Sequence, residues 1–391
     1  MDIDEVLARG VDKVYPSREA LKKAMGGKKL RIYQGFDPTG TELHIGHMVG
    51  FRKLAQLQKL GHHVIFLIGD GTGQAGDPSG KTKSRDKFLT NKELRDNAKS
   101  YVEQAGKIVD FGGNNPIEIL YNGDWLNKLS LEDILDIAGH FSLQQLIERD
   151  LFQERLKNKE EINLREFLYP LLQGYDSVAM NVDLEVGGSD QTFNMLCGRQ
   201  LVKQMQGREK FVLTTPLLTD SQGVKIGKTE GNVIALTDKP ADLFGKIMSL
   251  SDDVIVKGLE YLTDVPTTEI EEIEKKIKNG DNPMQYKKKL AAEIVEQLND
   301  KKAAENAQDA FESTFQKRED PQEAQEIAVT DTISISDLLT ANSIITSTSQ
   351  VKNLIREKAI EINGKVVTSP KEPVSAGQSI KVGKKTFIKT K

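Results

Sequence analysis

Residues 30–47 read LRIYQGFDPTGTELHIGH, and the fold of the chain can be worked out from this stretch. It opens with a short apolar run at 30–33, which predicts a buried strand, and glycines and a proline then turn the chain. A helical pattern follows over 48–60, and a second apolar run fills 63–68. Strand, helix and strand in this order predict a right-handed crossover between parallel strands, with ligands bound at their carboxyl ends.

The same alternation continues beyond this unit, with a helix expected over 91–108 and a strand near 116–120. It is typical of an α/β fold in which helices cover a mostly parallel sheet, and it predicts a Rossmann-like domain over 1–238. Residues 239–317 have helical periodicity throughout and predict an α-helical domain. A charged stretch without an apolar period predicts a linker over 318–331.

The last sixty residues, 332–391, differ in character from the rest of the chain. An amphipathic helix is expected at 351–356, a hairpin with an Asn-Gly turn at 360–366, and a further strand at 380–382. These elements predict a small, separate α+β domain.

Charge is distributed unevenly between this small domain and the body. Residues 332–391 hold ten Lys and Arg against four Asp and Glu, whereas the rest of the chain holds 44 against 54. A basic end on an acidic body is expected where one end touches a polyanion such as RNA, and a solvated lysine-rich surface explains the charges equally well.

The composition argues against several other classes of protein and of metal site. With Cys197 as its single cysteine the chain cannot form a disulfide framework or a zinc site of several thiolates, and we expect no protein-bound zinc. We find no apolar stretch of membrane-spanning length and no signal peptide, so we expect a cytoplasmic protein without a membrane partner.

The first candidate site lies where the helix after 30–33 begins. Thr39, His44 and His47 cluster there, and a helix N-terminus attracts phosphate through its N–H groups and dipole. Gly46 lacks a side chain, so a flat base has room against the backbone. The arrangement suits ATP, although a His-x-x-His pair alone is common and says little.

Two further segments carry cations that suit phosphate. Lys81 and Arg85 follow Asp77 in a glycine-containing loop near the sheet edge. Lys225 and Lys228 are separated by Ile226 and Gly227 and followed by Thr229, and such lysines can close over a triphosphate and stabilise leaving pyrophosphate. Each segment alone is also compatible with a charged surface loop.

Two polar segments suggest recognition of a small molecule. If 169–176 is helical, Tyr169, Gln173 and Asp176 share one face, although an ordinary surface face has the same pattern. In 187–191, Gly-Gly-Ser-Asp-Gln, two glycines end a strand before an acid of the kind that accepts from ribose hydroxyls.

Together and in this order, these segments resemble the tyrosyl-tRNA synthetases. The His-Ile-Gly-His segment at 44–47 reproduces one signature of the class I aminoacyl-tRNA synthetases, and the Lys-Ile-Gly-Lys-Thr segment at 225–229 resembles the second. The segments 33–39, 169–176 and 187–191 match the tyrosyl branch. The elements at the C-terminal end resemble the S4 RNA-binding domain, so the resemblance spans nearly the whole chain.

The resemblance implies a role for each matching residue. Tyr33 and Asp176 would hydrogen-bond the substrate phenol. The remaining tyrosine contacts would be Asp77, Tyr169 and Gln173 at the amino group and Gln191 near the carboxylate. ATP would lie against Gly35, Asp37, Gly46, Gly188, Asp190 and Lys228. The residues expected to act on its phosphates and on leaving pyrophosphate are Thr39, His44, His47, Lys81, Arg85, Lys225, Lys228 and Thr229.

The same resemblance implies an activity and its partners. Tyrosine would be activated with ATP, accompanied by Mg²⁺, to tyrosyl-adenylate, and then transferred to the 3′-terminal adenosine of tRNA(Tyr). The ionised carboxylate needs no general base. A homodimer is implied, through residues 124–165. Buried phenol partners would be left unpaired by phenylalanine, and this family is itself the documented case, with discrimination of about 10⁵ and no editing; we therefore expect no editing domain.

Three alternatives stay open at this point. A tryptophanyl-tRNA synthetase shares the fold and both signatures, but the Tyr33/Asp176 pair and the S4-like end argue against it. A catalytically silent RNA-binding relative is disfavoured by four intact residues of the two signatures, His44, His47, Lys225 and Lys228. An unrelated nucleotidyl transferase leaves the C-terminal domain unexplained.

Overall fold

The computed structural model divides the chain into two compact units, Met1–Ala304 and Glu305–Lys391. The residues it describes are 2–79, 88–226, 233–313, 325–329, 332–342, 344–345, 347–383 and 386–391. Four residues expected to act on phosphates therefore lie outside the described residues, namely Lys81, Arg85, Lys228 and Thr229.

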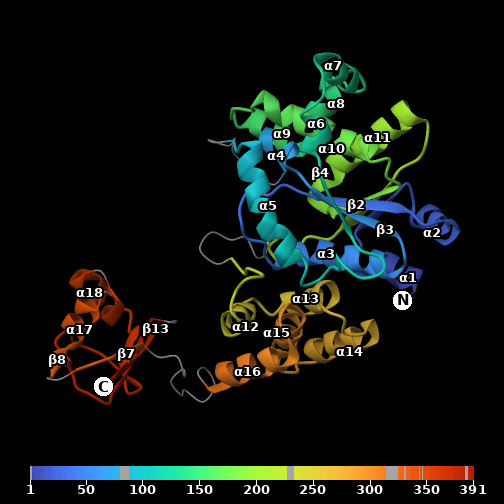
Figure 1. Ribbon diagram of the computed structural model, residues 1–391. Coiled ribbons are helices and arrows are strands. Elements are labelled where there is room, and N and C mark those ends of the chain that lie inside the picture. The colour runs from blue at the N-terminus through green and yellow to red at the C-terminus, as the bar shows by residue number, and fades with distance from the viewer. Residues whose placement is uncertain are drawn as a thin grey trace. The chain divides into compact units, whose positions relative to one another are not determined.

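A six-stranded sheet forms the centre of the first unit, in the order β1-β6-β5-β2-β3-β4 (Figure 1). Its strands are β1 (Lys13–Tyr15), β2 (Arg31–Phe36), β3 (His63–Ile68), β4 (Glu118–Tyr121), β5 (Leu184–Gly188) and β6 (Phe211–Thr215). All neighbours pair in parallel except β1, which is antiparallel to β6. Because helices cover both faces of such a sheet, its central strands are largely buried, and β3 is a continuous apolar run after its first residue.

Two crossover helices define the crevice of this sheet. Helix α3 (Ile45–Lys59) joins β2 to β3, and α11 (Thr192–Gln206) joins β5 to β6. These steps run in opposite directions along the sheet, so right-handed crossovers place the two helices on opposite faces. The carboxyl ends of the neighbouring strands β2 and β5 therefore open a crevice between diverging connections. The predicted strand, helix and strand are confirmed, with β2 extending to Phe36.

The other helices of this α/β portion surround the sheet. They are α1 (Ile3–Ala8), α2 (Arg18–Gly27), α4 (Thr72–Ala75), α5 (Asn91–Ala105), α6 (Gly123–Leu126), α7 (Leu131–Gly139), α8 (Leu143–Ile147), α9 (Asp150–Lys157), α10 (Leu164–Ala179) and the 3₁₀ turn η1 (Ser189–Gln191). Helix α10 packs closely on α11, because a Cβ at Gly174 would lie only 3.2 Å from the Gly198 nitrogen. The segment 169–176 is therefore helical and packed rather than a surface face.

A group of helices follows the sheet, as the sequence predicts for 239–317. They are α12 (Pro240–Met248), α13 (Val254–Leu262), α14 (Thr267–Lys278), α15 (Met284–Leu298) and α16 (Lys301–Phe311). Figure 1 shows α12 to α15 beyond α3, at the end of the unit away from α7.

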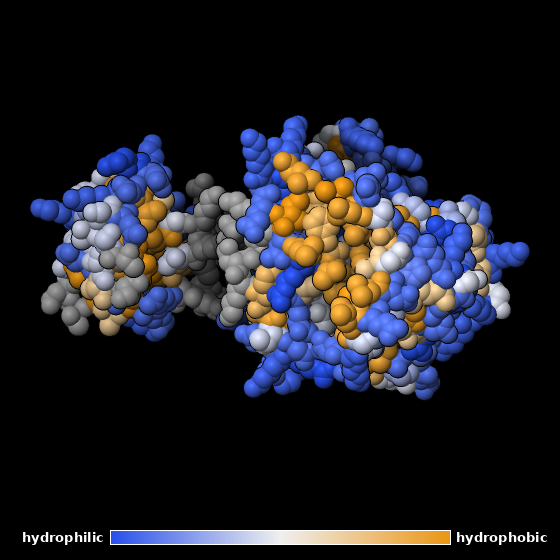
Figure 2. Space-filling view, turned by 90° about the horizontal axis from the view of Figure 1, so that it is seen from above, coloured by the Kyte–Doolittle hydropathy of each residue, from blue (hydrophilic) through white to orange (hydrophobic). Residues whose placement is uncertain are grey.

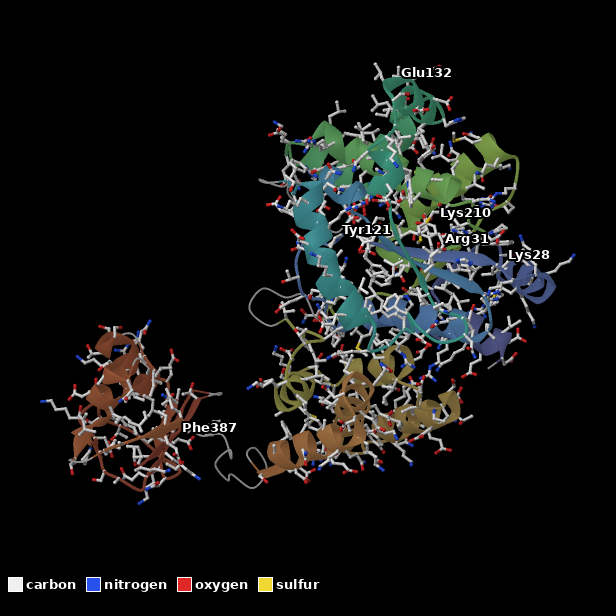
Figure 3. The ribbon with its side chains drawn as sticks, in the orientation of Figure 1. Lys28, Arg31, Tyr121, Glu132, Lys210 and Phe387 are labelled. Carbon is white, nitrogen blue, oxygen red and sulfur yellow. The ribbon has the colours of Figure 1, made fainter. Side chains whose placement is uncertain are left out.

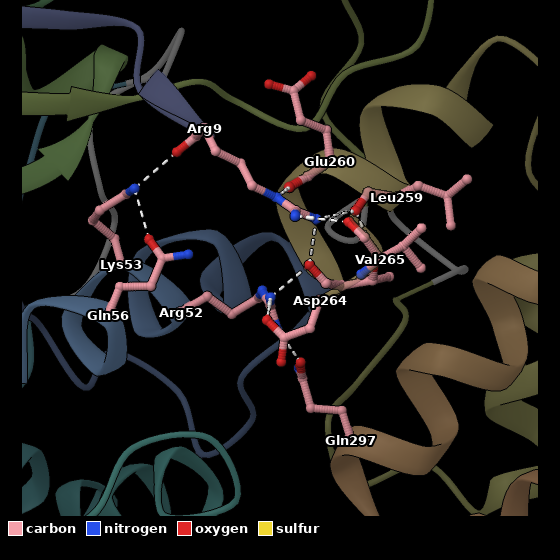
Figure 4. Close-up of polar contacts among 10 residues, drawn as sticks. Arg9, Arg52, Lys53, Gln56, Leu259, Glu260, Asp264, Val265 and Gln297 are labelled. Atoms are coloured by element: carbon pink, nitrogen blue, oxygen red, sulfur yellow. Dashed lines mark hydrogen bonds and ion pairs between the residues drawn. The ribbon is translucent and has the colours of Figure 1, made fainter. Parts of the chain in front are cut away.

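Cationic side chains at the end of α1 and on α3 contact this helical group (Figure 4). Arg9 donates to four backbone carbonyls, those of Glu260 and Val265 at 2.8 and 2.7 Å and those of Leu259 and Thr263 at 3.0 and 2.6 Å. Arg52 of α3 donates to the Thr263 carbonyl and also contacts Asp264 and Gln297. Arg9 thus bonds two carbonyls in the last turn of α13, where backbone acceptors lack donors within the helix, and both arginines bond the carbonyl of its C-cap, Thr263.

The second unit is a small α+β fold, as predicted. It contains β7 (Gln325–Ile327), β8 (Ile333–Ser334), α17 (Ile335–Ala341), α18 (Thr348–Arg356), β9 (Ile360–Ile362), β10 (Lys365–Val366), β11 (Pro373–Val374), β12 (Ser379–Val382) and β13 (Thr386–Thr390). Its main sheet has the order β10-β9-β12-β13-β7. Asn363 and Gly364 both have positive φ, 50° and 76°, as a tight hairpin turn between twisted strands requires.

One segment differs from expectation. Residues 325–327 fall within the expected linker, yet they form β7, which pairs in parallel with β13. Three residues with two exposed side chains have no periodic pattern, so only the partner strand reveals them as a strand. In the described part of the chain, every helix is too short or too polar to cross a membrane.

Candidate active site

The start of α3 lies at the crevice and is organised by two histidines. His44 is the N-cap, and its Nδ1 accepts from the Gly46 N–H at 3.2 Å, while the His44 N–H donates to His47 Nδ1 at 3.1 Å. The rings lie 4.0 Å apart. Since Nδ1 accepts in both rings, the proton of each neutral imidazole is carried by Nε2, which makes Nε2 a hydrogen-bond donor. Donors at a helix N-terminus suit a phosphate anion.

The second lysine-containing segment reaches the same place through its flanks. The Ile45 N–H donates to the Ile234 carbonyl at 3.0 Å, and the Leu236 N–H donates to the Leu43 carbonyl at 2.9 Å. On the other flank, a Cβ at Gly46 would lie 3.6 Å from the Ile226 carbonyl oxygen. The described residues on both sides of 227–232 thus meet the beginning of α3, although they lie far from it in the sequence.

Lys225 and Asp190 connect this segment to β5. Lys225 Nζ lies 2.7 Å from Asp190 Oδ2. Gly188 ends β5 two residues before Asp190, and a Cβ there would lie 2.7 Å from Asp190 Oδ1, so a side chain at this position would displace the Asp190 carboxylate. Along the β2 end, Gly35 and Thr39 are exposed to solvent. These residues line the side of the crevice expected to hold ATP.

A group of buried polar side chains, here called the buried pocket, joins β2 to α10. Asp176 is 1% exposed and accepts from Asn122 Nδ2 at 2.9 Å and from Trp125 Nε1 at 2.8 Å. The Tyr33 hydroxyl lies 3.0 Å from Ser177 Oγ. Burial raises the pKa of Asp176 well above its ordinary value, and the two N–H donors oppose that shift. Burial likewise raises the pKa of Tyr33, so its hydroxyl stays protonated.

Tyr169 and Asp37 form a second polar group beside this pocket. The Tyr169 hydroxyl donates to Asp37 Oδ2 at 2.9 Å, and Thr72 Oγ1 donates to Asp37 Oδ1 at 2.7 Å. Asp37 therefore ties the end of β2 to α4 and α10. Burial, and next the Asp37 carboxylate, raise the pKa of Tyr169 well above its ordinary value.

Asp77 and Gln191 are brought together from opposite parts of the sequence. Gln191 Nε2 donates to Asp77 Oδ2 at 2.9 Å, and Asn194 Nδ2 donates to Gln191 Oε1 at 2.9 Å. Gln173 lies on the same face of α10 as Tyr169 and Asp176 and donates to Glu185 Oε1 at 2.9 Å. Of the expected tyrosine contacts, Asp77 and Gln191 are thus joined directly by a hydrogen bond, while Tyr169, Gln173 and Asp176 share one face of α10.

Sequence reasoning missed the residues that hold these groups in place. Asn122 and Trp125 fix Asp176 but lie in a short turn and helix with no motif of their own. The buried pair Glu185 and Lys210 was also missed, because a lysine before a strand has no pattern that marks it as buried. Among the described residues, no three His, Cys, Asp or Glu side chains are grouped as a metal site would need.

The class of protein follows from comparison with known families. The family described as tRNA synthetases class I (W and Y) matches residues 25–316, and the S4 domain matches residues 340–380. The first match includes every expected site residue, and the second lies within the C-terminal unit.

Individual relatives indicate which branch of this synthetase family the chain resembles. A tyrosine–tRNA ligase of Mannheimia succiniciproducens is 40% identical, covering 99% of this chain and 98% of the relative, and one of Dehalococcoides mccartyi is 38% identical with the same coverage. The solved structure of a C-terminally truncated mitochondrial tyrosyl-tRNA synthetase of Aspergillus nidulans has a TM-score of 0.67 at 26% identity, covering 80% of this chain and 94% of that one. The chain belongs to the class I tRNA synthetase family and, within it, to the tyrosine–tRNA ligases.

Proposed function

We propose that this protein activates L-tyrosine with ATP, forming tyrosyl-adenylate and pyrophosphate, and then transfers the tyrosyl group to the 3′-terminal adenosine of tRNA(Tyr). The observation that carries the proposal is Asp176, a buried carboxylate held by two N–H donors. A carboxylate has lone pairs left after two such bonds, and these accept from a phenol hydroxyl. An indole offers its donor from a different position, which favours tyrosine over tryptophan.

The proposed roles follow the chemistry of each region. Tyr33 and Asp176 bind the phenol, and the residues proposed around the backbone of tyrosine are Asp77, Tyr169, Gln173 and Gln191. The ATP side comprises Gly35, Asp37, Gly46, Gly188, Asp190 and Lys228. The groups proposed to act on the phosphates are Thr39, His44, His47, Lys81, Arg85, Lys225, Lys228 and Thr229.

The reaction needs positioning and charge stabilisation rather than a base. The tyrosine carboxylate is ionised already and attacks the α-phosphate in line. The histidine donors at the start of α3 and the lysines stabilise charge on the departing pyrophosphate. Mg²⁺ would arrive with ATP, because triphosphate oxygens and waters supply most of its ligands.

The domains are proposed to divide the work. Residues 1–238 bind ATP and tyrosine, 239–317 lie on the anticodon side, 318–331 connect, and the basic region 332–391 binds tRNA. An S4 domain match and the positive balance of this end support an RNA contact. We place the protein in the cytoplasm, where its proposed tRNA substrate is used.

A homodimer is also proposed, through the surface around α7 to α10. Hydrophobic side chains gather on the face shown in Figure 2, on the side where α7 lies in Figure 1. The large exposed apolar residues there are Leu131, Ile134, Leu135, Leu143, Leu156, Leu164 and Leu168. The residues that line an adjoining groove of about 250 Å³ include Ile134, Ile137, Leu168 and Leu171. An apolar patch of this kind is typical of a protein interface.

ATP–pyrophosphate exchange with each amino acid in turn tests the proposal. We expect exchange with tyrosine alone. Exchange with tryptophan would be consistent with the family but would show that the proposed amino-acid substrate is wrong. The absence of exchange with every amino acid, in folded protein with Mg²⁺, would favour a relative that binds RNA without catalysis.

A further inference from the structure

A buried ion pair lies directly behind the tyrosine side of the site. Glu185 on β5 and Lys210 just before β6 have side chains that are 2% and 0% exposed, and the Lys210 ammonium contacts Glu185 Oε2. Lys210 also donates to the Met195 carbonyl at 3.2 Å. It lies among the side chains between the sheet and α11 (Figure 3), where a Cβ at Gly198 would be 2.7 Å from Lys210 Nζ. The glycine therefore makes room for the ammonium.

Packing alone does not explain this pair. Two charges lose their hydration when buried, and apolar residues of similar volume are often equally stable in their place. Burial lowers the pKa of Lys210, and the Glu185 carboxylate opposes that shift. The pair therefore calls for a role beyond stability.

The second oxygen of Glu185 points to that role, because Oε1 accepts from Gln173 Nε2 at 2.9 Å. An ionised carboxylate only accepts, so the Gln173 amide must turn its NH₂ toward Glu185 and its carbonyl oxygen away. That carbonyl oxygen is buried and has no hydrogen-bond partner among the described residues. Glu185 therefore selects one of the two possible orientations of the amide.

We propose that Glu185 and Lys210 are positioning residues that hold the Gln173 carbonyl oxygen toward the amino group of the bound substrate. This inference rests on the proposed function, which gives Gln173 that contact. An ammonium group donates only, so a carbonyl oxygen binds it and a reversed amide repels it. Lys210 acts through Glu185, because its ammonium contacts Oε2 and the other carboxylate oxygen, Oε1, accepts from Gln173.

The experiment distinguishes binding of the substrate's amino group from binding of its phenol and carboxylate. In ATP–pyrophosphate exchange with the full chain, the KM of tyrosine is compared with the inhibition constant of 3-(4-hydroxyphenyl)propanoate, which has the phenol and the carboxylate but no amino group. For Glu185→Gln we expect the KM of tyrosine to rise about 10- to 100-fold, because a hydrogen bond to a charged group is lost. We expect kcat to change little, since the contact exists before and during the reaction. The inhibition constant of the analogue should not change.

A second variant tests the same role without the unpaired buried charge that could destabilise Glu185→Gln. Glu185→Gln combined with Lys210→Met leaves no lone buried charge. The neutral amide that replaces the Glu185 carboxylate can still reverse Gln173, so the same selective loss is expected. Glu166→Gln is the matched control, because Glu166 forms another buried pair, 2.6 Å from Arg155 Nη1, without a hydrogen bond to Gln173. It should lower the melting temperature without selectivity between tyrosine and the analogue.

The other outcomes would contradict either the positioning role of Glu185 and Lys210 or the contact proposed for Gln173. Equal weakening of tyrosine and the analogue, or unchanged tyrosine kinetics in folded Glu185→Gln, overturns the positioning role alone. Gln173→Ala is the reference for the proposed function. If that variant shows no loss specific to the amino group, the contact assigned to Gln173 is wrong, and the positioning role fails with it.

Discussion

At the scale of single residues, the site is defined by how buried polar groups are satisfied. Asp176 accepts from Asn122 and Trp125, and Asp37 accepts from Tyr169 and Thr72. Each carboxylate is thereby held in one orientation before a substrate arrives. A buried acceptor that lacks its last donor is costly, and this cost is the physical source of selectivity for a hydroxyl group.

Asp176→Ala should therefore reduce kcat/KM for tyrosine by at least about 10- to 100-fold while changing the value for phenylalanine far less. Pyrophosphate exchange with the two amino acids measures both. Trp125→Phe, which removes one donor to Asp176, should produce a smaller loss in the same direction. Equal losses of kcat/KM with tyrosine and phenylalanine would show that Asp176 does not bind the phenol hydroxyl.

At the scale of elements, helix α3 has two functions along its length. Its N-terminus carries His44 and His47, and one to two turns later it presents Arg52 and Lys53 to other elements. Lys53 is 2% exposed and donates to the Val6 and Arg9 carbonyls at 2.6 and 2.8 Å. Burial, followed by the Arg9 and Arg52 charges, lowers the pKa of Lys53 to about 7.

The Lys53 shift predicts a pH dependence of stability. Between pH about 7 and about 10.5 the unfolded chain holds a proton on Lys53 that the folded chain lacks, so the free energy of unfolding rises with pH there, by at most about 1.4 kcal/mol per pH unit. In Lys53→Met this contribution is absent. Urea unfolding of both proteins at pH 7, 8 and 9 measures their free energies of unfolding. The value for the natural chain should rise relative to that for Lys53→Met as the pH rises. The same pH dependence in both proteins would contradict the pKa shift.

At the scale of the whole molecule, function is distributed over two units that each have their own core. The second unit packs Ile335, Val351, Ile360 and Ile388 within itself. The first unit holds every described residue of the proposed active site and the exposed apolar surface around α7 to α10.

Truncation after residue 313 should separate the two activities. Tyrosine-dependent pyrophosphate exchange should persist within about twofold, because every described site contact lies earlier in the chain. Charging of tRNA should fall by at least about tenfold at limiting tRNA, since the basic end supplies contacts with phosphates. Loss of exchange in a folded truncated protein would show that the second unit contributes to activation.

Leu164→Asp should convert the proposed dimer to a monomer, because Leu164 is 74% exposed within the apolar surface and a charge there would be buried on association. Light scattering coupled to gel filtration measures the mass. Met284→Asp places the same charge on an exposed apolar residue elsewhere and should not alter it. A dimer that survives Leu164→Asp would move the interface away from α10.

The sequence by itself determined the sheet pattern, the family signatures and the small C-terminal fold, because hydrophobic periodicity and turn chemistry act over short distances along the chain. Tertiary structure alone decided that Asn122 and Trp125 hold Asp176 and that Lys210 is buried against Glu185. It also revealed β7, whose three residues become a strand only through β13. These features depend on partners far away in sequence, and burial or pairing with a distant residue leaves no local pattern to read.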